Sequence, residues 1–226
     1  MKEQIDIIVN SKDLKNITSD IVEKVLDSQI SNEILQEIPI VKTLVGIKNI
    51  YSTYTDRIFI KKAMNVLLEL GDVNWKQRVE LTRELDDEDS SGTEKILMAI
   101  DQLETIKKCK VFGRLCKLKA LNKIDADEFS RLTKLVQDAY LEDLELVPYF
   151  KEKKKENIFQ EEFYPLVSLG LIYQEEPDPT PIEKVEATSF GESDYYKGGE
   201  IELTYSLSYL GDLILENYED LFPKKK

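Results

Sequence analysis

The chain contains no histidine among its 226 residues. Histidine is the side chain whose ordinary pKa lies nearest neutrality, and it is the commonest metal ligand. Its absence excludes Ser-His and Cys-His catalytic pairs and histidine-ligated zinc sites within this chain. The nine glycines form no dinucleotide-binding, Walker-type or nucleophile-elbow motif. We therefore expect a protein that is not an enzyme and that holds no cofactor.

Cysteine is scarce, with only Cys109 and Cys116. The two lie seven residues apart on a predicted helix, so they face one side of it at a separation of about 10 Å. That distance is too long for a disulfide, and the spacing matches no zinc or redox motif. Both cysteines are interpreted as core residues in a reducing compartment.

A long apolar run is also lacking. The longest apolar stretches, 38–41 and 43–47, are separated by Lys42 and are much shorter than a bilayer requires. The first residues, MKEQID, carry acids where a signal peptide is basic and then apolar. These features predict a cytoplasmic protein without a transmembrane segment.

Basic residues nearly disappear from the C-terminal third of the chain. Residues 156–223 hold sixteen Asp and Glu against two lysines, whereas residues 1–155 hold 28 acids and 26 bases. The shift predicts two domains, 1–155 and 156–226, of which the second is acidic. Phosphate backbones attract proteins through Lys and Arg, so no direct binding to duplex nucleic acid is expected.

Apolar residues recur at helical spacing through most of the first domain. Ser91–Glu94 fits an N-terminal capping box, and Asp125–Glu128 supplies acidic capping for a later helix. Asn122 is expected at the turn before that later helix. The first domain is therefore predicted to be a helical bundle within a mainly α chain of roughly six to eight helices.

The second domain differs from the first in its pattern of predicted helices and strands. A helix over 159–169 ends at Gly170, a long loop rich in Pro, Gly and acids covers 174–199, and Glu200–Tyr205 alternates in the manner of a strand. A final amphipathic helix is expected over 207–218. Helix, strand, long hairpin, strand and helix together predict a small winged-helix-like α+β module.

The densest carboxylate cluster in the sequence is Asp86, Asp87, Glu88 and Asp89. Clustered carboxylates can hold Mg²⁺ or Ca²⁺. The same residues precede a predicted helix N-terminus, where the helix macrodipole favours acids. Because no second set of ligands is visible in the sequence, capping is the preferred interpretation, and these four residues are the candidates should a metal bind.

Eight of the eleven tyrosines lie after Val147, among acidic residues. Tyrosine combines apolar area with a hydrogen-bonding tip and suits contacts between proteins. We predict contact with a protein partner, or with a second copy of the chain, through Tyr195, Tyr196, Tyr205 and Tyr209.

The main basic stretch runs from Lys107 to Lys119 on a predicted helix. Such a helix can contact anionic lipid or nucleic acid. The preferred interpretation is a solvated face that pairs with the acidic second domain, because the first domain is nearly neutral overall. On this hypothesis the second domain docks on that face, and salt weakens the docking.

Two segments resemble known families. Gly113–Phe129 (GRLCKLKALNKIDADEF) resembles the helical hairpin of tellurite-resistance TerB-like domains, with Asn122 where the family has glycine. Leu166–Ile172 (LVSLGLI) with Tyr205–Gly211 (YSLSYLG) resembles the ending of winged-helix modules. The combination is similar to uncharacterised bacterial proteins of the Abi-alpha (abortive infection) type. The resemblance implies a role in phage defence or in the biology of mobile elements, without specifying a mechanism.

Three functional hypotheses follow. The leading one is a non-catalytic interaction or sensor component of a bacterial antiphage system. The alternative is an acidic protein that imitates DNA and so inhibits or regulates a nucleic-acid-binding enzyme. The third is a metal-dependent enzyme built on the carboxylates of 86–89, which requires further carboxylates to converge in space.

Overall fold

The computed structural model describes residues 54–154, 161–175, 182–185, 195–198 and 204–224. The chain divides into two compact units, Met1–Leu141 with Glu219–Lys226, and Glu142–Tyr218. The two units are described separately below.

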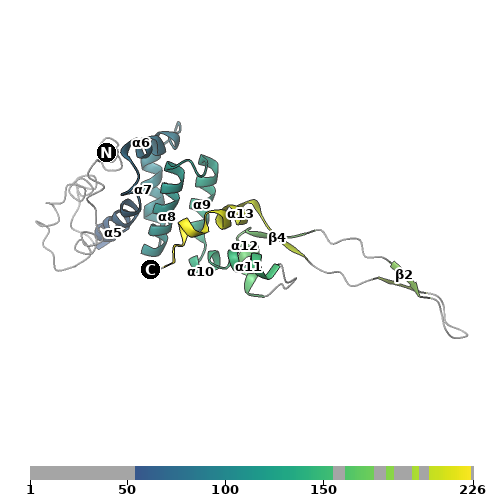
Figure 1. The fold of residues 1–226 in the computed structure, drawn as a ribbon. Coiled ribbons are helices and arrows are strands. Elements are labelled where there is room, and N and C mark those ends of the chain that lie inside the picture. The colour runs from purple at the N-terminus through teal and green to yellow at the C-terminus, as the bar shows by residue number, and fades with distance from the viewer. Residues whose placement is uncertain (1–53, 155–160, 176–181, 186–194, 199–203, 225–226) are drawn as a thin grey trace, which may run out of the picture. The chain divides into compact units, whose positions relative to one another are not determined.

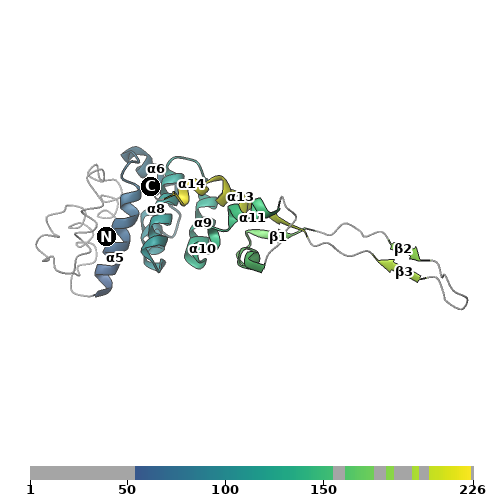
Figure 2. The ribbon, with the colours of Figure 1, turned by 60° about the horizontal axis from the view of Figure 1, so that its bottom comes forward.

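The described part of the first unit contains five helices of eight or more residues. They are α5 (Tyr54–Glu69), α6 (Trp75–Glu84), α7 (Gly92–Gln102), α8 (Ile106–Ala120) and α9 (Ala126–Asp138). Helix α8 lies between α5 and α9 and also packs against α6 (Figures 1 and 2). Its central position explains why Phe112, Leu115 and Cys116 are fully buried. The predicted helical bundle of the first unit is organised around this helix.

Local hydrogen bonds set the starts of three of these helices. Ser91 with Glu94 caps α7 and Asp125 with Glu128 caps α9, each as a reciprocal capping box, which confirms both sequence predictions. Asn74 with Gln77 forms a third capping box at the start of α6.

The turn between α8 and α9 requires a left-handed residue. Asn122 has φ 55°, a conformation that asparagine tolerates better than most residues. The Lys123 N–H donates to the Leu118 carbonyl and the Asn122 N–H to the Lys119 carbonyl, both at 3.0 Å. These two bonds define a Schellman motif and end α8. The sequence prediction of a helical hairpin with Asn122 at its turn is confirmed.

The C-terminal residues belong to the first unit. The Arg114 Nη1 donates to the Leu221 carbonyl at 2.8 Å, and the Lys123 Nζ lies 2.5 Å from the Asp220 Oδ2. Leu221, at the end of α14 (Tyr218–Leu221), is fully buried. The compact units thus differ from the predicted domains at two places, since residues 142–154 lie in the second unit and residues 219–226 in the first.

The second unit combines short helices with two small antiparallel sheets. Its helices are α10 (Leu141–Leu144), α11 (Val147–Lys154), the 3-10 helix η2 (Glu161–Phe163), α12 (Tyr164–Ser168) and α13 (Tyr209–Glu216). Phe150 and Phe163 meet edge to face at 5.2 Å between ring centroids and form part of its core. Pro148 lies in the first turn of α11, where its missing N–H is not needed.

Gly170 turns the chain from α12 into β1 (Ile172–Gln174), as the sequence predicts. It has φ 68°, and the Leu171 N–H returns to the Leu166 carbonyl in a second Schellman motif. Strand β1 pairs antiparallel with β4 (Tyr205–Leu207), with Tyr173 opposite Ser206. Most of the predicted strand Glu200–Tyr205 lies outside the described residues.

The segment 174–199, predicted as a long loop, contains two strands. Strand β2 (Ile182–Val185) pairs antiparallel with β3 (Tyr195–Gly198), with Val185 opposite Tyr195. The loop prediction is therefore corrected: its Pro and Gly content obscured two short strands, since isolated four-residue strands carry little periodicity. The prediction of a mainly α chain with a small α+β C-terminal part is confirmed.

Within the part of the chain that the structure describes, every helix is too short or too polar to span a bilayer.

Candidate functional site

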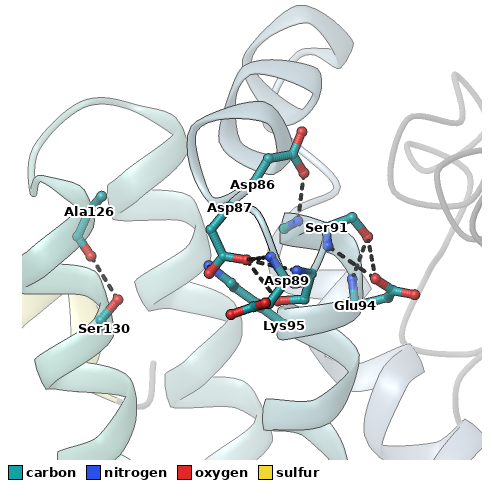
Figure 3. A network of polar contacts seen from close by, with 10 residues as sticks. Asp86, Asp87, Asp89, Ser91, Glu94, Lys95, Ala126 and Ser130 are labelled. Atoms are coloured by element: carbon teal, nitrogen blue, oxygen red, sulfur yellow. Dashed lines mark hydrogen bonds and ion pairs between the residues drawn. The ribbon is translucent and has the colours of Figure 1, made fainter.

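The carboxylates of 86–89 lie in the loop that joins α6 to α7 (Figure 3). The Gly92 N–H, at the start of α7, donates to the Asp86 Oδ1 at 2.7 Å. Asp86 therefore satisfies a helix N–H that has no partner within the helix. The loop places one acid directly on a helix N-terminus, as the capping interpretation predicts.

Asp87 folds the loop on itself. Its Oδ1 accepts hydrogen bonds from the backbone N–H groups of Ser90 at 2.7 Å and Asp89 at 3.1 Å. Its Oδ2 lies 2.5 Å from the Lys95 Nζ on α7. The hydrogen bond from Lys95, followed by that from the Ser90 N–H, lowers the pKa of the Asp87 carboxyl to about 2. Both oxygens of this carboxylate are therefore engaged, Oδ1 by the loop backbone and Oδ2 by Lys95 of α7.

Within the part of the chain that the structure describes, no further carboxylates join these four in a group that could hold a metal ion. Among the described residues, no three His, Cys, Asp or Glu side chains converge in a way that could hold a metal ion. The condition that the metal-enzyme hypothesis required is thus not met in that part of the chain. The capping contacts of Asp86 and Asp87 give a physical reason for the acidic composition of the loop.

The Asp87–Lys95 contact predicts a pH response. Because the folded-state pKa of Asp87 is depressed, its stabilising contribution is present above the unfolded value near 3.8 and is lost as pH falls through about 2. We expect Lys95→Met to raise the pKa of Asp87 toward that ordinary value, since it removes the largest cause of the shift. Carboxyl ¹³C chemical shifts followed from pH 7 to pH 1.5 measure this directly.

Lys134→Met is the matched control for this experiment. Lys134 pairs with Asp138 at the far end of α9, so its loss leaves the Asp87 titration unchanged. An Asp87 pKa that stays near 2 in Lys95→Met contradicts the assignment of Lys95 as the principal partner.

The two cysteines are free and buried in α8, as predicted. Burial raises the pKa of the Cys109 thiol to about 11 and that of the Cys116 thiol still further. The thiolate is the nucleophilic form of cysteine, so both thiols are unreactive at neutral pH.

Four cations of α8 are paired with acids of the first unit. The Arg114 guanidinium makes two contacts with the Glu69 carboxylate at 3.1 and 3.2 Å, from Nε and Nη2. Lys119 is 4% exposed and pairs with Glu84. Lys108 and Lys117 pair with Glu104 and Asp72.

These pairs engage four cations of the Lys107–Lys119 stretch with acids of the first unit, and docking of the second domain on that face stays a prediction. The described acids that contact it come from α5, α6 and the turns that follow α5 and α7. Residues that lie far apart in sequence meet here because α8 is the central helix, a position that helical periodicity alone does not reveal.

The predicted partner-binding tyrosines fall into two groups. Tyr209 is the first residue of α13 and is 64% exposed, and Tyr205 in β4 is half-buried. Tyr195 and Tyr196 occupy β3, where their side chains lie outside the described residues. The structure thus places Tyr209 where a partner can reach it.

Sequence reasoning missed other exposed tyrosines of the second unit, of which Tyr164 and Tyr173 are the most exposed. Tyr164 on α12 is 56% exposed and Tyr173 on β1 is 52% exposed. For Tyr173 the sequence did offer an indication, because it follows the apolar Ile172 in a strand and successive strand residues face opposite sides. In the structure Ile172 is buried and Tyr173 is exposed. For Tyr164 the sequence offers no comparable indication.

Comparison of the chain with protein-family models, with curated proteins and with solved structures finds no match.

Proposed function

We propose that this protein is a non-catalytic interaction or sensor component, acting in a bacterial antiphage system, and that its second unit contacts the partner protein. The observation that carries the proposal is the exposure of Tyr164, Tyr173 and Tyr209 in that unit. Exposed tyrosine is enriched at protein interfaces because it offers a large, rigid apolar surface with one hydrogen-bonding group.

The state of the reactive groups supports the same proposal. The cysteine thiols are buried with raised pKa values, Asp86 accepts from the helix N–H of Gly92, and Asp87 is engaged by the loop backbone and Lys95. The antiphage context comes from the resemblance to Abi-alpha type proteins in sequence and remains part of the proposal.

The test uses the full chain and point variants. A truncation after residue 155 cuts through the second unit and also removes Leu221 from the first, so it perturbs both. We instead compare the wild-type protein with the double variant Tyr173→Ala, Tyr209→Ala as affinity baits in the native host. Recovery of the partner is expected to fall at least tenfold, since a tyrosine at an interface hot spot contributes about 2 kcal/mol or more.

Tyr140→Ala is the matched control, because Tyr140 is 75% exposed but lies in the first unit. It should recover the partner as the wild type does. Equal recovery by the double variant would count against the second unit as the contact surface. Size-exclusion chromatography with light scattering on the same proteins shows whether the partner is a second copy of the chain.

A second candidate function is the acidic inhibitor that competes with DNA. Exposed acids of the second unit favour it, namely Glu161, Glu162, Asp212 and Glu216. The same pull-down discriminates the two functions: if duplex DNA added during washing releases the partner, the acidic surface imitates DNA. Release by salt alone indicates ordinary electrostatic attraction.

A further inference from the structure

A groove of about 420 Å³ lies in the first unit between α7 and α9. Its walls include side chains that are exposed to solvent, Met98 and Gln102 of α7 and Ala126 and Ser130 of α9. The two members of each pair are four residues apart, so each helix presents one face to the groove. A partner can therefore reach both walls.

Met98 supplies the apolar surface of this groove that remains in contact with water. It is 61% exposed, whereas the neighbouring lining residues Ala99 and Phe129 are buried. Covering an exposed apolar side chain is favourable, because it removes that surface from water. Methionine suits contact with a partner, since its unbranched, polarizable side chain adapts to apolar groups of different shape. The groove thus offers an anchor point for an apolar side chain.

The loop 86–89 gives one end of the groove negative charge. Of its four carboxylates, that of Asp87 is paired with Lys95. The other three are exposed and form no ion pair with the described residues, namely Asp86, Glu88 and Asp89. Figure 3 shows this loop and Lys95 facing Ala126 and Ser130 of α9. Carboxylates without a cation beside an apolar wall attract a basic partner and repel nucleic acid and anionic lipid.

The backbone of the groove walls indicates the form of that partner. The walls belong mainly to α7 and α9, whose main-chain groups are used in helix hydrogen bonds. An extended segment would find no sheet edge to pair with there, whereas a helix satisfies its own N–H and C=O groups. From Ala126 to Gln137 the groove follows about 16 Å of α9, which is the length of about three helical turns.

We propose that the groove between α7 and α9 binds an amphipathic helix of a partner protein. The apolar stripe of that helix packs on Met98, and Lys or Arg beside the stripe pair with the free carboxylates of the loop 86–89. The net charge of −13 disfavours a second copy of the chain as the occupant, because like charges repel. The groove lies in the first unit and uses none of the tyrosines of the second, so either proposal can fail without the other.

The test titrates three synthetic peptides, each of about four helical turns, into the full-length ¹⁵N-labelled protein. The first carries leucines at helical spacing and lysines on its other faces. The second has glutamate in place of lysine, and the third has the composition of the first with the leucines spread over all faces. We expect saturable amide shifts at Met98, Gln102 and Ala126 with the first peptide, and at least tenfold weaker binding of the other two.

Variants assign the binding of the first peptide to the groove. Met98→Gln keeps the length of the side chain and removes its apolar end, so binding should weaken about tenfold. The double variant Glu88→Gln, Asp89→Asn should weaken it about fivefold, because two ion pairs are lost. All three side chains are exposed, so the variants should keep the amide spectrum of the folded protein.

The matched control is the double variant Glu161→Gln, Glu162→Gln. It changes the net charge by the same amount at exposed positions of the second unit, and it should bind the first peptide as the wild type does. The proposal is overturned if the wild type shows no saturable shifts at the groove, if Met98→Gln binds as tightly as the wild type, or if the two double variants weaken binding equally. Light scattering that reveals a dimer, with the same groove amides shifting on dilution, would instead assign the groove to a second copy.

Discussion

Replacing Gly92 with alanine is expected to lower the free energy of unfolding by about 3 kcal/mol. A Cβ at this position would lie 2.0 Å from the Thr82 carbonyl oxygen and 2.7 Å from the Leu85 Cβ. The first of these is a backbone atom, which cannot move aside as a flexible side chain can. Helices α6 and α7 would have to separate, and the Gly92 N–H would shift from Asp86.

Urea denaturation followed by circular dichroism measures this effect. The midpoint should fall while the slope stays constant, because the surface exposed on unfolding is nearly unchanged. In a thermal scan the same loss corresponds to a decrease in Tm of about 6–12 °C for a protein of this size.

Gly170→Ala is the matched control for the close approach. It also places a methyl group on a glycine, but nothing lies within 4 Å of that methyl group. Its cost arises from φ 68° alone and should be about 1 kcal/mol. If Gly92→Ala proves as mild as Gly170→Ala, α6 and α7 do not pack as closely as the structure places them.

Local signals in the sequence predicted the parts of the fold that depend on neighbouring residues. The capping boxes at Ser91 and Asp125 involve residues three apart, and the turns at Asn122 and Gly170 depend on one backbone conformation each. Each of these features depends on residues within three or four positions of one another, so a single sequence is enough to predict it.

Features that depend on distant residues could not be predicted in the same way. The partners of Arg114 and Lys119 lie 45 and 35 residues earlier in the chain. The return of Leu221 to the first unit joins positions 107 residues apart. Periodicity shows that α8 has an apolar face but not which helices cover its other sides.

The candidate sites illustrate the same limit. Asp87 stands in an obvious acidic cluster, yet its role in holding the loop follows from its contacts with Lys95 and the Ser90 N–H. The acidic composition of the cluster does not show those contacts. Met98 is unremarkable in sequence, because single apolar residues occur on most protein surfaces. Only the placement of α9 beside α7 shows that its side chain lines a groove.

Phe112→Ala is expected to have the second large effect, a loss of about 3–5 kcal/mol in the free energy of unfolding. Phe112 is fully buried in the central helix and packs against Phe129 of α9. Alanine removes the whole ring, and the helices around α8 can close the resulting space only in part. The loss therefore combines the transfer of a buried ring to water with the cost of a cavity.

Two further variants serve as comparisons in the same urea experiment. Phe112→Leu keeps most of the apolar volume and should cost less than about 1.5 kcal/mol. Tyr140→Ala removes an aromatic ring that is 75% exposed and should change stability by no more than about 0.5 kcal/mol. A Phe112→Ala protein as stable as Tyr140→Ala would show that the ring is not held between α8 and α9.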